Sequence, residues 1–345
     1  MKRYLIPEKG RFYKAALHCH STVSDGKLTP EELKREYMNL GYSVVAYTDH
    51  DIMIPHPELL DENFVPIAAM EIAIDKKENW KSYQNTYHLN VYAPEVNRSV
   101  SGTFCEENAS KREHTKAMIT DEMRRAGHKS REYTKEFAQK MIDIATEEGC
   151  LVSFNHPVWS MNTRDDYSGL KGFFGVEWMN TGCDMAGYID SMQPIAELLN
   201  EGERMCYPLA TDDIHSMKQL GKSWCQIKAE RLDYDTIFEA LRKGDFYSSN
   251  GPEIKELYVE DGIVHVKTSN VSRISLVTDH RLIIGKRSDD DDLTEAELSL
   301  DKFKEHMENA PDGHISWLRV DVMDKSGKYA RTRAFFTEEL LDGGI

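Results

Sequence analysis

The stretch KAALHCH, residues 14–20, runs from small apolar residues into two histidines. The stretch SVVAYTDHD, residues 43–51, repeats this arrangement and ends in Asp49, His50 and Asp51. Short apolar runs of this length are typical of buried strands. We therefore predict two strands, each followed directly by metal-ligating side chains.

The segment between these two strands has clear helix boundaries. Thr29 is the expected N-cap, Pro30 takes the first helical position, Glu32 completes a capping box and Gly41 ends the helix. The helical spacing predicts a buried face made by Leu33, Tyr37 and Leu40.

The same alternation of strand and helix continues to about residue 230 and predicts a mainly parallel α/β sheet or barrel. The expected strands are Lys14–His18, Ser43–Thr48, Val65–Met70, Tyr87–Tyr92, Cys150–Phe154, Phe173–Trp178 and Met205–Ala210, with Trp224–Ala229 as a possible eighth. A polar helical stretch, residues 103–149, is longer than one crossover needs, and we interpret its first half as an insertion that covers the site.

The turn-rich segment GDFYSSNGP, residues 244–252, follows a helix expected at Tyr234–Lys243. Beyond it the pattern changes to short alternating strands at Ile263–Thr268, Ile274–Thr278 and Trp317–Val322. We therefore predict a catalytic domain of residues 1–250 and a small β-sandwich-like domain of residues 251–345.

Composition excludes several classes of function. The 345 residues carry a net charge of −16, which disfavours binding of duplex nucleic acid. No apolar run reaches the roughly 18 residues of a membrane span, and residues 1–9 do not resemble a secretory signal. The six cysteines are scattered and read as reduced, buried thiols, so we expect a cytoplasmic protein. The oligomeric state is left open.

Potential ligands recur at the expected strand ends, which converge on one face in barrel proteins. His18 and His20 are two positions apart, so both imidazoles project to one side of an extended backbone. The further candidates are Asp25, His50, Glu71, His88, His156, Asp213 and His215. Each alone is equally well explained as a core, turn or capping residue. Together they favour a metal site, because carboxylates buried at one face cost several kcal/mol without a compensating cation.

These motifs resemble those of the PHP superfamily, named for polymerase and histidinol phosphatase. The resemblance lies in His18-x-His20 with Asp25-Gly26, in the segment 48–51, in Glu71 and His88, in the segment 155–157 and in Asp213-x-His215, and it covers residues 13–216. It implies a distorted, TIM-like barrel of seven βα units. The segment 240–252 and the β-rich tail are similar, more weakly, to metallohydrolases that include carbaryl hydrolases.

The resemblance also implies a ligand set for two or three divalent ions. A first ion would use His18, His20, Glu71 and Asp213, and a second would share Glu71 with His88 and His156. A third would use Asp25, His50 and His215. Some family members have His where this chain has Asp25. Imidazole and carboxylate ligands suit zinc, manganese and iron alike.

We therefore predict a metal-dependent hydrolase in which a hydroxide bridging ions about 3.5–4 Å apart attacks a small phosphomonoester or nucleotide. Glu71, Asp213 and Asp51 are the expected catalytic carboxylates. Arg164, Lys222 and Trp159 are candidates to bind substrate, although a solvated surface role explains Arg164 and Lys222 better and packing explains Trp159 equally well. The alternatives are a carboxylic ester or carbamate hydrolase on the same ions, and a noncatalytic metal-stabilised module.

Overall fold

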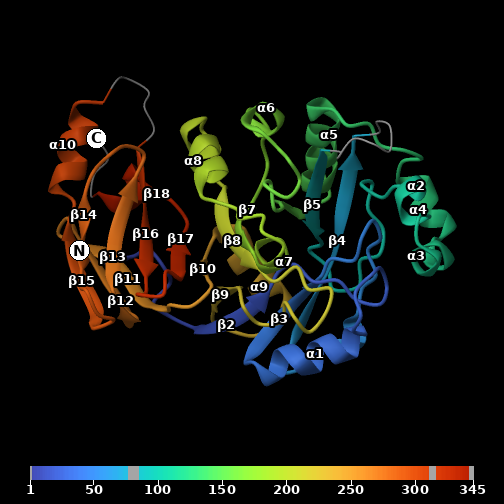
Figure 1. The fold of residues 1–345 in the computed structure, drawn as a ribbon, viewed down its shortest axis with the longest axis horizontal. Helices are drawn as coiled ribbons and strands as arrows, with labels where there is room; N and C mark the ends of the chain where they lie inside the picture. The colour runs from blue at the N-terminus through green and yellow to red at the C-terminus, as the bar shows by residue number, and fades with distance from the viewer. Residues whose placement is uncertain (1, 77–84, 311–315, 342–345) are drawn as a thin grey trace.

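The computed structural model describes residues 2–76, 85–310 and 316–341. Its first part contains the elements that carry the predicted ligands (Figure 1). The strands are β1 (Arg3–Tyr4), β2 (Arg11–Ala16), β3 (Tyr42–Tyr47), β4 (Val65–Asp75), β5 (Thr86–Tyr92), β6 (Leu151–Phe154), β7 (Gly175–Asn180), β8 (Tyr207–Thr211), β9 (Trp224–Ala229) and β10 (Phe246–Ser249). The helices are α1 (Pro30–Asn39), α2 (Glu106–Ala109), α3 (Glu113–Met118), α4 (Asp121–Ala126), α5 (Lys135–Glu147), α6 (Arg164–Tyr167), α7 (Thr181–Met185), α8 (Gln193–Asn200) and α9 (Tyr234–Lys243), with a short 3-10 turn at Pro57–Leu59.

The second part is mostly β-structure. Its elements are β11 (Ile254–Glu260), β12 (Ile263–Val271), β13 (Arg273–Thr278), β14 (Ile284–Arg287), β15 (Leu293–Ser299), α10 (Asp301–Glu308), β16 (Trp317–Met323), β17 (Tyr329–Thr332), β18 (Phe335–Phe336) and α11 (Thr337–Leu340). The strands expected from the sequence are present, with ends that shift by a few residues.

Helix α1 begins as predicted. Thr29 accepts from the Glu32 amide, and the Glu32 side chain accepts from the Thr29 amide. Leu33 and Tyr37 are buried against the sheet. The prediction for Leu40 is wrong: this side chain is 46% exposed, because the helix ends at Asn39 and Leu40 is the C-cap, where the helical spacing no longer applies.

Fourteen of the described strands form one mixed sheet. Its order is β14-β13-β16-β17-β10-β9-β2-β3-β4-β5-β6-β7-β8, with β18 paired to β16. Its pairing among the described residues is an open path, so a closed seven-stranded barrel is not confirmed. Strand β8 lies close to β9 and β10 without pairing with them. Instead, β9 pairs antiparallel with β2 and β10 and links this sheet to the C-terminal strands.

Strand β5 also departs from the expected parallel order. It runs antiparallel to both β4 and β6. The reason is the length of β4, which continues five residues past the predicted end at Met70 to Asp75. The connection from Asp75 to Thr86 is then shorter than the dozen or so residues that a parallel crossover needs.

The C-terminal strands form two layers around one apolar core. A separate sheet, β1-β11-β12-β15, faces β13, β16 and β17, and Leu257, Val264, Val320 and Val322 are buried between the layers. Figure 1 shows these strands and the N-terminus at one end of the molecule and α2–α4 at the other. Because β1 pairs with β11, the first residues belong with the C-terminal strands.

All six cysteines are buried and free of disulfides. No described helix has both the length and the apolar character required to cross a bilayer.

Candidate metal centre

The segments after β2 and β8 are joined side by side. Cys19 and Ile214 form an isolated parallel bridge, and the His20 amide donates to the Ile214 carbonyl at 3.1 Å. This pairing brings the His18–His20 motif next to Asp213, although the two segments are almost 200 residues apart in the chain.

The loop that carries Asp25 is fixed by Asp49. The Asp49 carboxylate accepts from the backbone amides and the hydroxyls of both Ser21 and Ser24, at 2.6–3.1 Å. Gly26 closes this loop, because a Cβ atom at that position would lie 2.1 Å from the His20 carbonyl oxygen. Asp49 therefore positions a ligand loop and has its own oxygens fully engaged.

His88 reaches the site through the reversed direction of β5. It lies near the start of that strand, a poor position for a ligand if β5 were parallel to its neighbours. Because β5 is antiparallel, its first residues lie at the edge where β3 and β6 end, and His88 pairs across the strands with Ala73. Glu71, predicted to end its strand, lies inside β4 and contacts the segment after β3, where it forms a bridge with His50.

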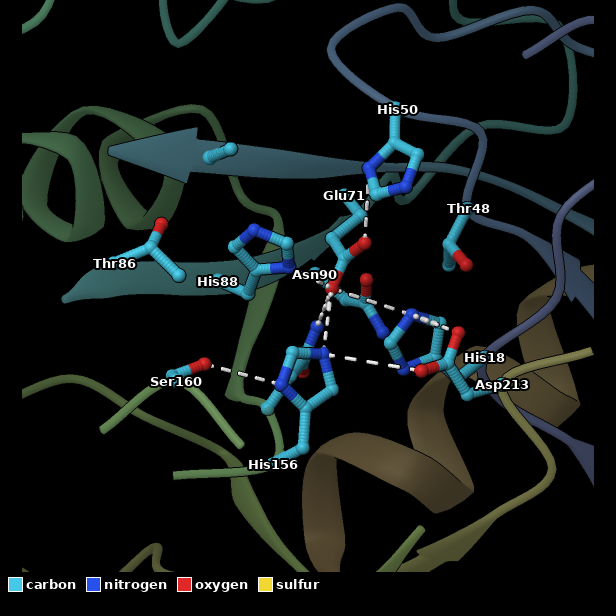
Figure 2. A network of polar contacts seen from close by, with 12 residues as sticks. His18, Thr48, His50, Glu71, Thr86, His88, Asn90, His156, Ser160 and Asp213 are labelled. Atoms are coloured by element: carbon cyan, nitrogen blue, oxygen red, sulfur yellow. Dashed lines mark hydrogen bonds and ion pairs between the residues drawn. The ribbon is translucent and has the colours of Figure 1, made fainter. Parts of the chain in front are cut away.

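The Glu71 carboxylate is the centre of the ligand set. Imidazole nitrogens of five histidines lie within 3.5 Å of its oxygens. Figure 2 shows the rings of His18, His50, His88 and His156 around it. The closest nitrogen–oxygen distances belong to His88 at 3.0 Å and to His50 and His156 at 3.1 Å, followed by His18 at 3.3 Å and His20 at 3.5 Å.

The other two predicted carboxylates complete the cluster. Asp213 Oδ1 lies 3.1 Å from His20 Nε2, 3.3 Å from His18 Nε2 and 3.6 Å from His215 Nδ1. Asp25 lies 3.5 Å from His50 Nε2 and 3.6 Å from His215 Nε2. All nine predicted ligands therefore converge on one place.

Glu177 is a further acidic group that the sequence analysis missed. It is fully buried in β7, accepts from His18 Nδ1 at 2.8 Å and is held by Thr211 and Asn180. A carboxylate bonded to the outer nitrogen of a ligating histidine fixes the ring orientation. The available signal was a glutamate inside the otherwise apolar segment GVEW, residues 175–178.

Three residues of the site have left-handed backbone conformations. The φ angles are +61° at Asp51, +27° at His156 and +48° at Asp213, although none is glycine. Each of these residues lies in the loop that follows a strand, namely β3, β6 or β8. Such conformations cost of the order of 1–3 kcal/mol and persist only where the surrounding structure enforces them, as at functional sites.

The electrostatics match a cation-binding site. Burial alone would raise the pKa of Glu71, but His88, His18 and His156 outweigh burial and hold that pKa well below its usual range. The pKa of Asp213 is likewise held low, since His18 and His20 outweigh burial. Burial, with His50 and His215 nearby, lowers the pKa of His20 to about 3, so this ring is neutral and has a lone pair to offer.

The residues present fit divalent ions. His20 Nδ1 and Asp213 Oδ1 are buried without a hydrogen-bond partner, and such atoms are costly unless a cation or water satisfies them. Four compact donor groups share this region. Three of them parallel the ion sites that the family resemblance implies, namely His18, His20 and Asp213; Glu71, His88 and His156; and His20, Asp25, His50 and His215. The fourth is His18, His156 and Glu177.

The predicted substrate residues divide between the site and the surface. Trp159 lines the cavity over the ligands, with its ring centroid 5.4 Å from that of His88 and 5.1 Å from that of His156. Arg164 is exposed on α6 and pairs with Glu201 at 3.0 Å, away from the cavity. Lys222 lines a different groove. Asp51 lines the cavity but is engaged by the buried Arg131.

The cavity has a volume of about 430 Å³. Two basic side chains that the sequence analysis missed also line it. Lys111 and Arg112 lie between α2 and α3, within the predicted insertion. Lys111 Nζ is 3.0 Å from Asp75 and an Arg112 nitrogen is 3.2 Å from Asp25. The insertion therefore places positive charge beside the ligand cluster.

Asp190 holds the Trp159 loop, and its titration predicts a pH effect on stability. The carboxylate accepts from the Val158 amide at 2.9 Å, its other oxygen is buried without a hydrogen-bond partner, and burial raises its pKa from 3.8 to about 7. Between about pH 4 and pH 7 the unfolded chain has lost this proton and the folded chain retains it, so stability falls as the pH rises.

The Asp190→Asn variant should not lose stability in this way, because asparagine has no carboxyl proton to release. Its free energy of unfolding, relative to the unsubstituted protein, should rise through this window by up to about 4 kcal/mol and level off above pH 7. Urea unfolding from pH 4 to pH 8 measures the difference. A difference that does not change with pH contradicts the assignment.

Comparisons with known proteins add the following. No family model matches the chain. A 62-residue segment, 18% of this chain, is 44% identical to a 5'-3' exoribonuclease from Haemophilus influenzae, and the match spans 20% of that relative's length.

Two solved structures are similar to this chain at low sequence identity. One, from Bacteroides vulgatus, is a two-domain protein containing a predicted PHP-like metal-dependent phosphoesterase. It is similar over 97% of both chains, with a TM-score of 0.42 and 12% identity. The other, an amidohydrolase from Chromobacterium violaceum with bound sulfate and no metal, is similar over 59% of this chain and 88% of its own, with a TM-score of 0.33 and 15% identity.

Proposed function

We propose that this protein is a metal-dependent phosphoesterase of the PHP superfamily that releases phosphate from a small phosphomonoester or nucleotide. The observation that carries the proposal is the Glu71 carboxylate, which is buried among five imidazoles and lies at the base of an open cavity. The PHP-type barrel and the division into residues 1–250 and 251–345 are part of this proposal, as is a cytoplasmic location.

Two or three ions of zinc, manganese or iron would be held by the three donor groups described above. Such ions supply a nucleophilic water at neutral pH and offset charge on a reacting phosphoryl group. Glu71 would be shared between ions, while Glu177 orients His18 and Ser160 orients His156 through its Nδ1 at 3.1 Å. Asp51 is proposed to position the segment that carries His50.

The basic side chains that line the cavity favour a phosphoester substrate over a neutral ester. Lys111 and Arg112 face the same cavity as the ligands, and both are partly exposed there. A guanidinium group matches the geometry of phosphate oxygens and remains charged at all physiological pH values. Trp159 lines the same cavity beside His88 and His156 and offers a planar surface, which suits a nucleobase or another flat group. The local match to an exoribonuclease, an enzyme acting on a phosphoester, supports the same choice.

The test is a hydrolysis screen of protein loaded with zinc, manganese or iron, with metal content measured on the same sample. Phosphate release from monoesters is the expected result. Cleavage of carboxylic esters or carbamates without phosphate release would replace the proposal with the alternative hydrolase. Bound metal without turnover of phosphomonoesters, phosphodiesters or carboxylic esters would indicate a noncatalytic module.

The Lys111→Met and Arg112→Met variants separate phosphate recognition from catalysis. Each should weaken competitive inhibition by inorganic phosphate by about tenfold, since a charged hydrogen bond is worth about 1.5–3 kcal/mol. The matched control is Arg164→Met, because Arg164 is a surface cation paired with Glu201 outside the cavity. Equal effects in the cavity variants and the control would contradict the role assigned to Lys111 and Arg112.

A further inference from the structure

A second groove lies next to the metal centre. It has a volume of about 760 Å³ and is lined by Lys14 from β2, Lys222 from the segment before β9 and Lys328 from the turn before β17. Asp184 is the one carboxylate among its lining residues. In a chain with a net charge of −16, this is an unusual concentration of positive charge.

The three ammonium groups are free to meet an anion. Within the part of the chain that the structure describes, none of them forms an ion pair with a carboxylate. Lys14 Nζ lies over the rings of Tyr42 at 4.2 Å and Trp224 at 4.0 Å, and Lys222 Nζ is 3.8 Å from Met185 Sδ. Burial lowers the pKa of Lys14, although the charges of Asp212 and Glu253 act in the opposite direction.

The groove and the metal cavity share two walls. Helix α7 contributes Gly182 and Cys183 to the cavity and Thr181, Asp184 and Met185 to the groove. The segment after His215 contributes Gln219 to the cavity and Gly221 and Lys222 to the groove. The two hollows therefore lie next to each other along these two segments.

The loop that carries Lys222 is held in a fixed conformation. The backbone amides of Gly221, Lys222 and Ser223 donate to the Asp212 carboxylate at 2.6, 3.0 and 2.9 Å. Asp212 directly precedes Asp213 in the ligand cluster, so the position of Lys222 is tied to that of a metal ligand.

We propose that this groove binds a second phosphate group of a substrate that carries more than one, while the reacting phosphate occupies the metal cavity. The inference rests on the proposed phosphoesterase function and narrows its substrate class to multiply phosphorylated molecules. Lysine ammonium groups bind phosphate as point charges and suit a group that must be held without being cleaved.

The test compares two triple variants that remove the same charge. The groove variant carries Lys14→Met, Lys222→Met and Lys328→Met. The control carries Lys9→Met, Lys228→Met and Lys243→Met, at three lysines that line another hollow of about 600 Å³ together with four carboxylates, Glu230, Asp235, Glu239 and Asp245. Circular dichroism and thermal melting establish that both variants fold.

Binding is measured without turnover, by fluorescence anisotropy of a 5'-phosphorylated, fluorescein-labelled RNA tetramer in the presence of a chelator. The groove variant should bind at least about tenfold more weakly. Its slope of log affinity against log salt should also be shallower by about 0.7, as expected for the loss of one phosphate contact to a single strand. The control should stay within about twofold of the unsubstituted protein. Equal losses in both variants would overturn the inference, because they would reflect net charge alone.

Kinetics with metal-loaded protein identify the source of the second phosphate. The preference for fructose 1,6-bisphosphate over fructose 6-phosphate should fall at least about tenfold in the groove variant if the ligand is a small bisphosphate. A loss confined to the RNA tetramer assigns the groove to an oligonucleotide. If the unsubstituted protein releases no phosphate from any substrate, the proposed function fails, and the groove's role as a substrate subsite is overturned with it. If the unsubstituted protein releases phosphate normally and the groove and control variants do not differ, the groove proposal is overturned and the proposed function stands.

Discussion

Replacement of Glu71 by Gln is expected to remove both bound metal and hydrolytic activity. The substitution keeps the size of the side chain and deletes the charge that five imidazoles surround. Partners that only orient a ligand typically contribute 10–100-fold to metal affinity or activity. A shared ligand should contribute more, so phosphate release should fall by more than about 100-fold and the metal content by at least one equivalent.

The control for this substitution is Asp321→Asn. Asp321 is another buried carboxylate with cationic partners, Arg319 at 2.8 Å and Arg331 at 3.4 Å, but it lies on β16 within the C-terminal strands. This variant should retain its metal and its activity, whatever its stability. Metal analysis and phosphate release on the same preparations decide the result. Full metal content in Glu71→Gln would show that the carboxylate is not a ligand.

Replacement of Arg131 by Met should cause the largest loss of stability. The Arg131 guanidinium is buried and donates to Asp51, to the Ala73 carbonyl at 2.8 Å and to the Thr103 carbonyl at 2.7 Å. Removing it leaves the Asp51 charge and two carbonyl groups without this partner. Breaking a buried ion pair in this way typically costs 3–5 kcal/mol, and urea unfolding should show a loss of about that size.

A double-mutant cycle with Asp51→Asn identifies the cause of that loss. If the unpaired charge is responsible, the double variant should be less destabilised than the sum of the two single variants. Additive losses would instead assign the effect to packing of the arginine side chain. The Arg131→Met variant should also make the insertion less rigid. Arg131 joins Thr103 to β4 and to the segment that carries His50.

Local sequence signals were enough to predict the helix α1, most strands and the nine side chains that converge at the candidate site. Thr29, Pro30 and Glu32 act within one turn of helix, and His18 and His20 lie on one extended segment, so their relation does not depend on the rest of the fold. The antiparallel direction of β5 was missed because it depends on where β4 ends. Glu71 was predicted to end that strand, although the apolar residues Ile72, Ala73 and Ile74 follow it and the strand continues to Asp75.

The cations around the cavity could not be predicted for a different reason. Arg164 and Lys222 were chosen because they follow ligand motifs in the chain, but proximity in sequence does not determine which way a side chain faces. Arg112 meets Asp25 across 87 residues, and Arg131 meets Asp51 across 80. Both arginines come from a polar segment whose pattern resembles any solvated helix. The sequence analysis expected the first half of this segment to cover the site, but only the three-dimensional arrangement shows which of its cations reach the cavity.

The sheet that runs without interruption through both halves of the chain limits how the protein can be divided. Strand β10 pairs with β17, Tyr247 is buried in the core of the C-terminal strands, and Trp178 donates to Ser248 at 2.8 Å. Truncation after residue 250 would therefore expose the edge of β10 and an apolar surface, a combination that favours aggregation. Expression of the ligand-bearing half by itself should yield insoluble material, so biochemical work on this protein requires the full-length chain.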